Sequence, residues 1–398
     1  MIIINTPQID TEGDFVIISA GIEINEVVEK LWYKFPVKFK LYLVTENVDA
    51  FLVGLLFLAL KSGNNITLKA PVSARLFYTI RHYLIPALTL ANPDFFKIKI
   101  FAQHLNYEDL NTGKVAGTGL SCGIDSFATY YDHLKETGTY KINYFTYFNV
   151  GSHLDFGGDN ARKIYQKRLL SINEFAQNGG IGMISVDSNL SEILKMNFQQ
   201  THSLRSISCI LNLQKLFKNY YYASAYRLDH FKLNPKDTSD FDLLNVQMLS
   251  TESTNFFTSV GQYSRVERTL MVAEHRETYQ KLDVCTNPLM ASGFINCSTC
   301  YKCLRTQLTL DLAEKLELYK DVFDINKYNK IKDHYIAQLL WKNKKTPLDI
   351  EVIEFLKLNK YKPTATIYYL GVTSRLNSLK VNLKNLIKNS IKKFPNRK

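Results

Sequence analysis

The sequence predicts an α/β protein whose core is a parallel β-sheet, and three observations support this class. Short apolar runs alternate with helical patterns between about residues 113 and 303, which is typical of βαβ units. A turn rich in glycine and serine, residues 117–126 (GTGLSCGIDS), stands between the first strand and the first helix of this repeat. Four cysteines near its end have the spacing of a metal site.

The repeat should contain four strands and three helices. We expect the strands at residues 114–119, 142–150, 182–187 and 221–226, and the helices at residues 126–136, 159–177 and 204–217. Short loops around helices of this length produce right-handed crossovers, which make neighbouring strands parallel. Ligands of such sheets bind outside the carboxyl ends of the strands, so the loops after the second and third strands should face the glycine-rich turn.

Two further regions flank this core, which we place at residues 111–310. Residues 1–110 predict a small mixed α/β accessory domain, with strands at 15–24, 39–44, 66–70 and 96–102 and helices at 49–61 and 74–90. Residues 311–398 predict a helical region. Helices are expected there, and at its border with the core, at residues 304–317, 332–341 and 350–358.

Composition excludes several classes of protein. Hydrophobic residues make up 46% of the chain and charged residues 22%, which is typical of globular proteins and not of disordered ones. The longest apolar stretch, residues 51–60, is too short to span a bilayer and predicts a buried helix. The first residues lack the pattern of a signal peptide, and bunched cysteines favour a reducing compartment. We therefore expect a cytoplasmic protein.

The net charge of +12 is concentrated near the end of the chain. Residues 355–398 contain eleven Lys or Arg and no acidic residue. Residues 376–394 place leucine and isoleucine at helical spacing, with Lys380, Lys384, Lys388 and Lys392 on another face. This pattern predicts a basic amphipathic helix that contacts an anionic membrane surface, RNA or an acidic protein partner. A helix that packs on its own domain is the alternative.

The glycine-rich turn has the composition of an anion site. Backbone N–H groups and the helix dipole attract anions at a helix N-terminus. Gly119 and Gly123 allow the backbone to approach a phosphate, while Ser121 and Ser126 can donate hydroxyl hydrogen bonds. Asp125 would repel phosphates unless a cation lay between them, which indicates Mg²⁺. An ordinary glycine-rich turn with capping serines is the alternative.

Residues 121–126 (SCGIDS) resemble the Ser-Gly-Gly-x-Asp-Ser signature of the PP-loop ATP pyrophosphatases. These enzymes adenylate a substrate oxygen and release pyrophosphate, so the resemblance implies an adenine nucleotide alpha hydrolase-like core that binds ATP. Every fixed position matches except the first glycine, which is Cys122 here. Because cysteine has a Cβ atom, we expect either a negative φ at Cys122 or tolerated strain.

The late cysteines are Cys285, Cys297, Cys300 and Cys303. A Cys-x-x-Cys pair can hold one tetrahedral ion, and two further cysteines complete a closed shell, so we expect structural zinc. An iron–sulfur cluster is the competing interpretation, and buried free cysteines are the third. Cys209 lies on an apolar helical pattern and should belong to the core.

A PP-loop followed by this cysteine pattern resembles the cyano-deazaguanine synthases of the queuosine pathway and their homologues. Asn296, Lys302, Arg305 and Thr306 extend the resemblance, which covers about residues 113–310. Members of that family are α/β ATP pyrophosphatases with a four-cysteine zinc site. They convert a deazaguanine carboxylate through an adenylate to an amide and then to a nitrile. This chain departs from them at Cys122 and in its long flanking regions.

The expected site follows from the turn, the strand ends and this resemblance. We expect cofactor contacts at Gly119, Leu120, Ser121, Gly123, Ile124, Asp125, Ser126, Val150, Gly151, His153, Asp187 and His202. The resemblance implies catalytic roles for Ser121, Asp125, Ser126, Arg205 and Arg265. The expected cofactors are ATP, Mg²⁺ and Zn²⁺.

The expected activity is ATP-dependent ligation through a carbon–nitrogen bond, with AMP and pyrophosphate released. A carboxylate of the deazaguanine type is adenylated, and the acyl group passes to ammonia or to a protein amine. Relatives with extra domains occur in bacterial antiphage and modification systems, so the resemblance implies a protein substrate or an operon partner, and we expect a homodimer. The alternatives are a PP-loop enzyme that modifies tRNA, such as a thiolase or lysidine-type ligase, and a non-catalytic nucleotide-sensing subunit.

Overall fold

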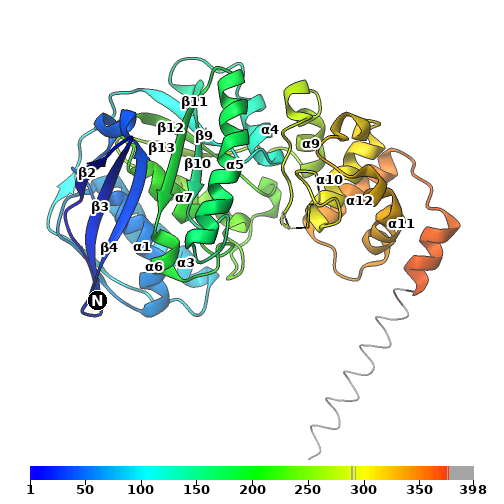
Figure 1. The fold of residues 1–398 in the computed structure, drawn as a ribbon. Coiled ribbons are helices and arrows are strands. Elements are labelled where there is room, and N and C mark those ends of the chain that lie inside the picture. The colour runs from blue at the N-terminus through cyan, green and yellow to red at the C-terminus, as the bar shows by residue number, and fades with distance from the viewer. Residues whose placement is uncertain (288–289, 292, 374, 376–398) are drawn as a thin grey trace, which may run out of the picture. The chain divides into compact units, whose positions relative to one another are not determined.

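The computed structural model describes residues 1–287, 290–291, 293–373 and 375 (Figure 1). The chain divides into two compact units, Met1–Tyr263 and Ser264–Lys398. The predicted domain boundaries near residues 110 and 310 both fall inside these units. The basic amphipathic helix predicted over residues 376–394 lies outside the described residues.

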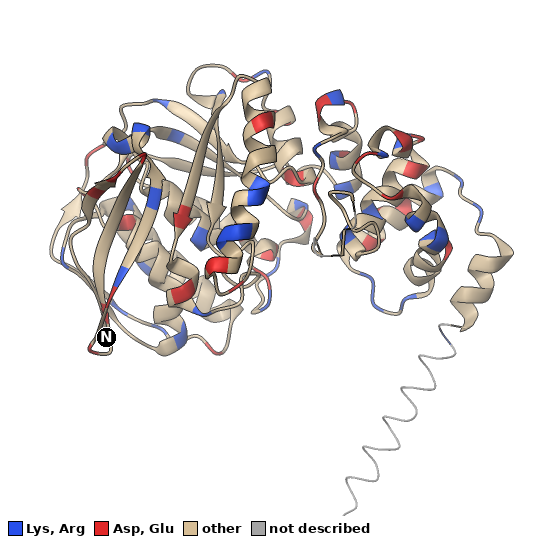
Figure 2. Cartoon of the chain, viewed as in Figure 1, with Lys and Arg blue, Asp and Glu red and all other residues tan. Residues whose placement is uncertain are grey.

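The first unit contains an eleven-stranded sheet. Five neighbouring strands form its main parallel block: β9 (Val115–Gly119), β10 (Ile142–Asn149), β11 (Gly182–Ser188), β12 (Phe217–Ala223) and β13 (Asn255–Ser259). Three strands of the N-terminal region form a second parallel group. Asp187 and Lys218 are the charged residues of the main parallel block, whose strands are otherwise uncharged in Figure 2. Such composition suits strands that helices cover on both faces. The largely parallel α/β core predicted from the sequence is therefore confirmed.

The strand order reverses beside β9. Across the sheet, the five strands of the main parallel block lie in the order β13, β12, β9, β10, β11. The chain therefore moves outward from β9 through β10 and β11, then returns to the other side of β9 for β12 and β13. In open α/β sheets, such a reversal leaves a crevice at the carboxyl ends of the two central strands.

Helices cover both faces of the parallel strands (Figure 1). They are α4 (Ile124–Asp132), α5 (Asp159–Asn178), α6 (Leu190–Leu194), α7 (His202–Leu211) and α8 (Asp242–Met248). Short 3₁₀ helices are η3 (Gly138–Tyr140), η4 (Leu228–His230) and η5 (Thr238–Phe241). On one face, the rings of Phe127 in α4 and Phe175 in α5 lie 5.0 Å apart. On the other face, α7 packs against a helix from the N-terminal region.

The N-terminal strands continue the same sheet. They are β1 (Ile2–Ile4), β2 (Gln8–Glu12), β3 (Phe15–Ile24), β4 (Val27–Pro36), β5 (Ile66–Leu68) and β7 (Ile100–Ala102). β4 runs antiparallel to β11, with Lys34 opposite Asp187 and Tyr33 opposite Ser188. Backbone hydrogen bonds cross this junction, so the sheet continues without a break from residues 1–110 into the parallel strands. A separate two-stranded sheet pairs β6 (Val72–Ser73) with β8 (Leu105–Asn106).

The N-terminal helices are α1 (Asp49–Ser62), α2 (Ala74–Thr79), the π-helix η2 (Ile80–Leu84) and α3 (Ile85–Ala91). α1 is the buried helix predicted from residues 51–60, and eleven of its residues are buried. The strand expected at residues 39–44 is wrong, because the 3₁₀ helix η1 (Val37–Tyr42) follows Pro36 there.

Two predicted borders near β12 are also wrong. The helix expected to reach residue 217 ends at Leu211, and the strand expected at 221 begins at Phe217. Leu213, Leu216 and Phe217 continue the apolar helical spacing, but Phe217 pairs with Val115 in the sheet. The free energy gained by burying this aromatic strand beside β9 outweighs the local preference of these residues for a helix. The fifth parallel strand, β13, was not predicted.

The second unit is helical over its described part. Its helices are α9 (Arg265–Val272), α10 (Tyr301–Leu312), α11 (Ile325–Trp341) and α12 (Pro347–Leu358), with 3₁₀ helices η6 (Arg276–Thr278) and η8 (Leu316–Tyr319). Ser264 and Glu267 form a capping box on α9, and Thr346 and Asp349 form one on α12. The predicted helical character is confirmed, although α11 begins at Ile325 rather than at residue 332 because Asp324 caps it.

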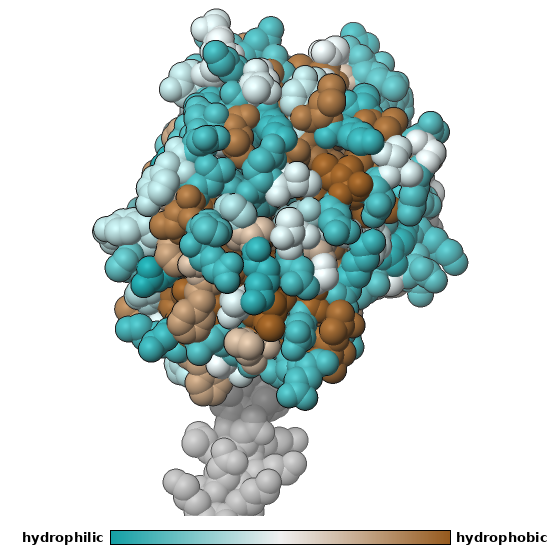
Figure 3. Space-filling model, turned by 90° about the vertical axis from the view of Figure 1, so that its left-hand side faces the viewer, coloured by the Kyte–Doolittle hydropathy of each residue, from teal (hydrophilic) through white to brown (hydrophobic). Residues whose placement is uncertain are grey.

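The surface of the first unit carries scattered apolar side chains. Exposed examples are Phe15, Val27 and Val28. Figure 3 shows apolar side chains in several groups separated by hydrophilic ones. Among the helices that the structure describes, none combines the length and the apolar character needed to cross a membrane.

Candidate functional site

The glycine-rich turn joins β9 to α4 and is closed by its own serines. Leu120 N donates to Thr146 O (2.9 Å), which ties the turn to β10. The hydroxyl oxygens of Ser121 and Ser126 lie 3.2 Å apart, and Ser126 Oγ donates to Gly123 O (3.0 Å). The two hydroxyls that were predicted to bind phosphate therefore lie together at the start of α4.

Cys122 has a left-handed backbone conformation, with φ of 58°, and its side chain is buried. This is the position at which the resembling signature has glycine, and of the two expected alternatives, a negative φ or tolerated strain, the structure has the second. A left-handed conformation costs about 1–2 kcal/mol for a residue with a Cβ atom. Strain of this kind persists only where the surrounding structure enforces it, and it often marks a functional turn.

The turn lies where the strand order reverses. Its two flanking strands, β10 and β12, pair with opposite edges of β9. Thr118 Oγ1 donates to Tyr221 O (2.9 Å), and Thr146 Oγ1 is 2.6 Å from the Tyr220 hydroxyl oxygen. These bonds fix the three central strands at the level of the turn. The crevice outside them would be bordered by the N-terminus of α4, where the dipole favours anions.

The residues of the turn differ in what they can offer a ligand. Ser121 is exposed, and Gly119, Gly123 and Asp125 are partly exposed. Asp125 lies in the first turn of α4. Leu120 and Ile124 have buried side chains, so they can contribute only backbone groups.

Arg205 is buried and organises the loops at this edge of the sheet. Its guanidinium donates to Val150 O (3.1 Å), Asp155 O (3.0 Å), Ser191 Oγ (3.1 Å) and Met196 O (2.7 Å). Burial lowers the pKa of Arg205 to about 10. These contacts join the loop after β10 to the segment after β11, so the geometry gives Arg205 a structural role in place of the predicted catalytic one.

Gly151 is needed for this arrangement. Its φ is +118°, and a Cβ atom there would lie 2.4 Å from Arg205 Nη1 and 2.7 Å from Phe198. A side chain at this position would displace the guanidinium. Val150 and Gly151, both predicted to contact the cofactor, thus pack against Arg205 immediately after β10.

His153 faces an aromatic cluster. Its Nε2 lies 2.6 Å from the Tyr147 hydroxyl oxygen and its Nδ1 lies 3.1 Å from Ser152 Oγ. Its ring also contacts Tyr165. Burial, together with the positive charge of Arg168, lowers the pKa of His153 to about 3. The neutral imidazole is therefore packed within this aromatic cluster.

Asp187 belongs to a polar network that the sequence did not reveal. Asn149 Nδ2 donates to Asp187 Oδ1 (2.7 Å), and Arg162 Nε donates to Asp187 Oδ2 (3.2 Å). Arg162 Nη2 also donates to Glu192 Oε1 (2.6 Å). The network joins the carboxyl ends of β10 and β11 to α5. Arg162 could not be distinguished in the sequence from the other basic residues of its charged helix.

His202 lies beside β12, at the first position of α7. Its Nδ1 is 2.6 Å from the Tyr222 hydroxyl oxygen, and its Nε2 is 2.9 Å from Ser239 Oγ and 3.5 Å from Asp237 Oδ1. Burial acts to raise the pKa of Asp237, but the bonds from His202 and Ser239 outweigh it and hold the pKa at about 2. Tyr221 is paired with Thr118, so Tyr222 stands at the level of Gly119.

Arg265 belongs to the second unit. It is the first residue of α9, and its backbone N–H donates to Glu351 Oε2 (2.7 Å). This contact links the start of α9 to α12.

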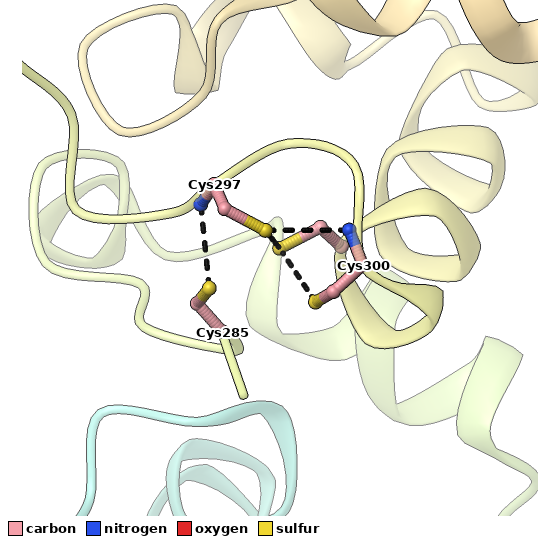
Figure 4. A group of neighbouring side chains, drawn as sticks. Cys285, Cys297 and Cys300 are labelled. Atoms are coloured by element: carbon pink, nitrogen blue, oxygen red, sulfur yellow. Dashed lines mark hydrogen bonds between the residues drawn. The ribbon is translucent and has the colours of Figure 1, made fainter. Parts of the chain in front are cut away.

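The second unit brings all four predicted cysteine ligands together (Figure 4). The sulfur atoms of Cys285, Cys297, Cys300 and Cys303 all lie within 4.8 Å of one another. Figure 4 labels the first three of these residues. The Sγ atoms of Cys300 and Cys303 are 3.3 Å apart, and those of Cys297 and Cys303 are 3.9 Å apart. Tetrahedral zinc with bonds of about 2.3 Å places its sulfurs ~3.8 Å apart, so the residues fit such an ion.

Backbone N–H groups hold the thiols in place. Cys300 N donates to Cys297 Sγ and Cys297 N donates to Cys285 Sγ, both at 3.3 Å (Figure 4). Asn287 N donates to Cys285 Sγ at 3.2 Å. Hydrogen bonds from Cys285 and Cys303 lower the pKa of Cys300. A metal ion would replace the thiol protons.

Asn296 connects the two cysteine-bearing segments. It is buried, accepts a bond from Val284 N (2.9 Å), and donates through Nδ2 to Leu282 O (2.8 Å) and Val322 O (3.1 Å). Gln307 Nε2 donates to Ser298 O (3.0 Å) and so ties the cysteine turn to α10. In the sequence, Asn296 was notable only because it precedes Cys297. The structure shows that its side chain links the two cysteine-bearing segments.

Together, the fold and the site define a mixed α/β protein with a largely parallel central sheet and a four-cysteine site that could bind a metal ion, consistent with zinc. No protein-family model matches the chain, and no curated protein matches its sequence. What the chain does must therefore follow from the chemistry of its residues.

The burial of His153 predicts an acid-sensitive fold. As the pH falls below 6.5, the ordinary pKa, the unfolded chain takes up a proton that the folded chain does not. Stability is therefore lost toward low pH, by about 2 kcal/mol at about pH 5. Denaturant unfolding of the wild type and of His153→Gln, at about pH 5 and at a pH above 6.5, measures this loss of stability. A variant with the same pH dependence as the wild type would contradict the assignment.

The cysteine site predicts a metal-dependent second unit. Cys300→Ser should lose the metal and lower the free energy of unfolding by at least about 3 kcal/mol, because metal-binding energy is folding energy at such sites. Metal analysis and calorimetry test this. The matched control is Cys209→Ser, at a buried cysteine of the first unit, which should keep the full metal content. Unchanged metal content in Cys300→Ser would remove that residue from the ligand set.

The left-handed conformation at Cys122 predicts a selective response to substitution. Cys122→Gly should keep stability within about 1 kcal/mol, since relief of strain offsets lost packing. Cys122→Val should cost at least about 2 kcal/mol, because a β-branched residue adopts this conformation least readily. Denaturant unfolding compares the two. Equal stability of the glycine and valine variants would argue against a left-handed turn.

Proposed function

We propose that the chain is a PP-loop ATP pyrophosphatase that activates a carboxylate as an acyl adenylate and passes the acyl group to an amine. The observation that carries this proposal is the strained turn at Cys122, at the carboxyl end of β9 and beside the reversal of strand order. Its conformation is the one that the glycine of the resembling signature would adopt without strain. The serines and Asp125 stand at the same helix N-terminus.

The first step forms the adenylate. An oxygen of the substrate carboxylate attacks the α-phosphorus of ATP, and the bond from that phosphorus to the bridging oxygen of the β-phosphate breaks. The electron pair leaves with pyrophosphate, whose charge must be stabilised. Ser121, Ser126 and the backbone N–H groups of the turn would hold the departing phosphates.

Asp125 has the chemistry of a magnesium ligand. Oxygen donors from a carboxylate and from hydroxyls are those that Mg²⁺ accepts, and both are present in the turn. When bound, Mg²⁺ would supply positive charge to the β- and γ-phosphates. The residues of the turn would position these phosphates so that the α-phosphorus faces the incoming carboxylate.

The second step transfers the acyl group. The amine nitrogen attacks the acyl carbon, the bond from that carbon to the phosphate oxygen breaks, and AMP leaves while the amine loses a proton. Ammonia would give an amide, and a further activation of the amide oxygen would give a nitrile. A protein amine would give a conjugate. A deazaguanine-type acid is the substrate that the resemblance favours, and a role in antiphage defence or modification rests on the same resemblance.

One observation favours a second candidate function. The basic residues concentrated between positions 355 and 398 would suit an enzyme that acts on RNA, such as a PP-loop thiolase or lysidine-type ligase. RNA would then bind with an affinity that falls steeply with salt.

The test is product analysis by mass spectrometry with ATP, Mg²⁺ and a carboxy-deazaguanine, with and without ammonia. We expect AMP, pyrophosphate and an amide or nitrile, or a mass increase on a protein. Asp125→Ala should reduce AMP formation by at least about 100-fold without changing the melting temperature. Asp159→Ala is the matched control, because this carboxylate also begins a helix but is 95% exposed. Full activity in Asp125→Ala would overturn the proposal, and ATP binding without turnover would favour a nucleotide sensor.

A further inference from the structure

A cavity of about 390 Å³ lies within the second unit. Its wall includes Tyr301, Tyr335, Gln338, Trp341, Lys342 and Arg375. The volume falls within the range of small-molecule sites, roughly 300–1,000 Å³, which are mostly apolar with a few polar groups. Neither the cysteine site nor the proposed adenylation chemistry uses this cavity.

Aromatic rings form much of the wall. Tyr301 begins α10, while Tyr335 and Trp341 come from the last part of α11. The rings of Tyr301 and Tyr335 lie 5.7 Å apart at 83°, and those of Trp341 and Tyr368 lie 5.5 Å apart at 74°. Tyr301 and Trp341 remain partly exposed, so parts of these two rings are open to a planar ligand.

Basic side chains accompany the rings. Lys342 Nζ lies 5.4 Å from the centre of the Tyr301 ring, and the guanidinium carbon of Arg305 lies 5.6 Å from the same centre. Arg375 also lines the cavity. Asp349 offsets part of this charge, because its Oδ2 is 3.1 Å from Lys342 Nζ. The cavity wall therefore combines aromatic side chains with two basic residues, Lys342 and Arg375, of which Lys342 is paired with Asp349.

The hydroxyl of Tyr335, whose side chain lines the cavity and is 1% exposed, has no hydrogen-bond partner among the described residues. A buried donor without a partner costs about 1–3 kcal/mol. Such groups in a folded protein call for an explanation, and a bound acceptor supplies one.

We propose that this cavity binds a nucleotide, with the base against the aromatic wall and the phosphate near Lys342 and Arg375. Proteins recognise unpaired nucleotides by stacking their bases on aromatic rings and by pairing their phosphates with basic side chains. A free nucleotide and a nucleotide within a single strand offer the same chemistry. This inference does not depend on the adenylation proposal, which concerns the first unit.

Tryptophan fluorescence provides the test, because Trp341 lines the cavity and Trp32 is the second tryptophan of the chain. In a Trp32→Phe background, thymidine monophosphate and a short oligothymidylate should each quench the emission of Trp341 to saturation. Pyrimidine probes are used because ATP is expected at the turn of the first unit. If the oligonucleotide binds at least about tenfold tighter than the monophosphate, the ligand is a single-stranded nucleic acid. Equal affinities would identify the ligand as a free nucleotide.

Substitutions distinguish nucleotide binding in this cavity from non-specific electrostatic attraction to the protein surface. Arg375→Glu should weaken binding at least about tenfold, and Tyr335→Phe about threefold through loss of one hydroxyl. Lys344→Glu, at an exposed position outside the cavity wall, should change binding less than about twofold. No quenching, equal quenching by duplex DNA, or quenching unaffected by Arg375→Glu in a variant of unchanged melting temperature would each overturn the proposal.

Discussion

The pairing of β9 with both β10 and β12 is the constraint on which the first unit depends. It places the chain's glycine-rich turn at the edge of the sheet where the strand order reverses. Arg205 then joins the loops beyond β10 and β11, and His202 contacts Tyr222 beside the turn. Arg205 and His202 thus hold the loops at this edge in fixed positions, which is what a preorganised binding site requires.

The sequence was most informative where a residue type has only one structural use. The four cysteines could be assigned to one site from their spacing, and the parallel strands could be assigned from their alternation with helices. The sequence was least informative where tertiary contacts determine the local structure. β4 joins β11 through backbone pairs that carry no sequence signal, and Phe217 leaves a helical pattern to enter the sheet. Arg205 and His153 looked like ligand contacts because burial cannot be read from a polar loop.

The second unit depends on its cysteines in a similar way. Cys300 caps α10 and Cys303 lies in its first turn, so the position of Tyr301 between them is fixed by the same turn that would hold the ion. Tyr301 in turn contacts Tyr335, Arg305 and Lys342. A metal ion held by these cysteines would therefore fix the same helix start that positions Tyr301 in the cavity wall.

The most direct test of the central claim is a crystal structure with Mg²⁺ and an ATP analogue that cannot be cleaved between its α- and β-phosphates. The account predicts that the β- and γ-phosphates lie against Ser121, Gly123 and Ser126, with the cation beside Asp125. This result does not depend on knowing the acyl substrate. A nucleotide bound elsewhere in the first unit, with the turn unchanged and empty, would contradict the account.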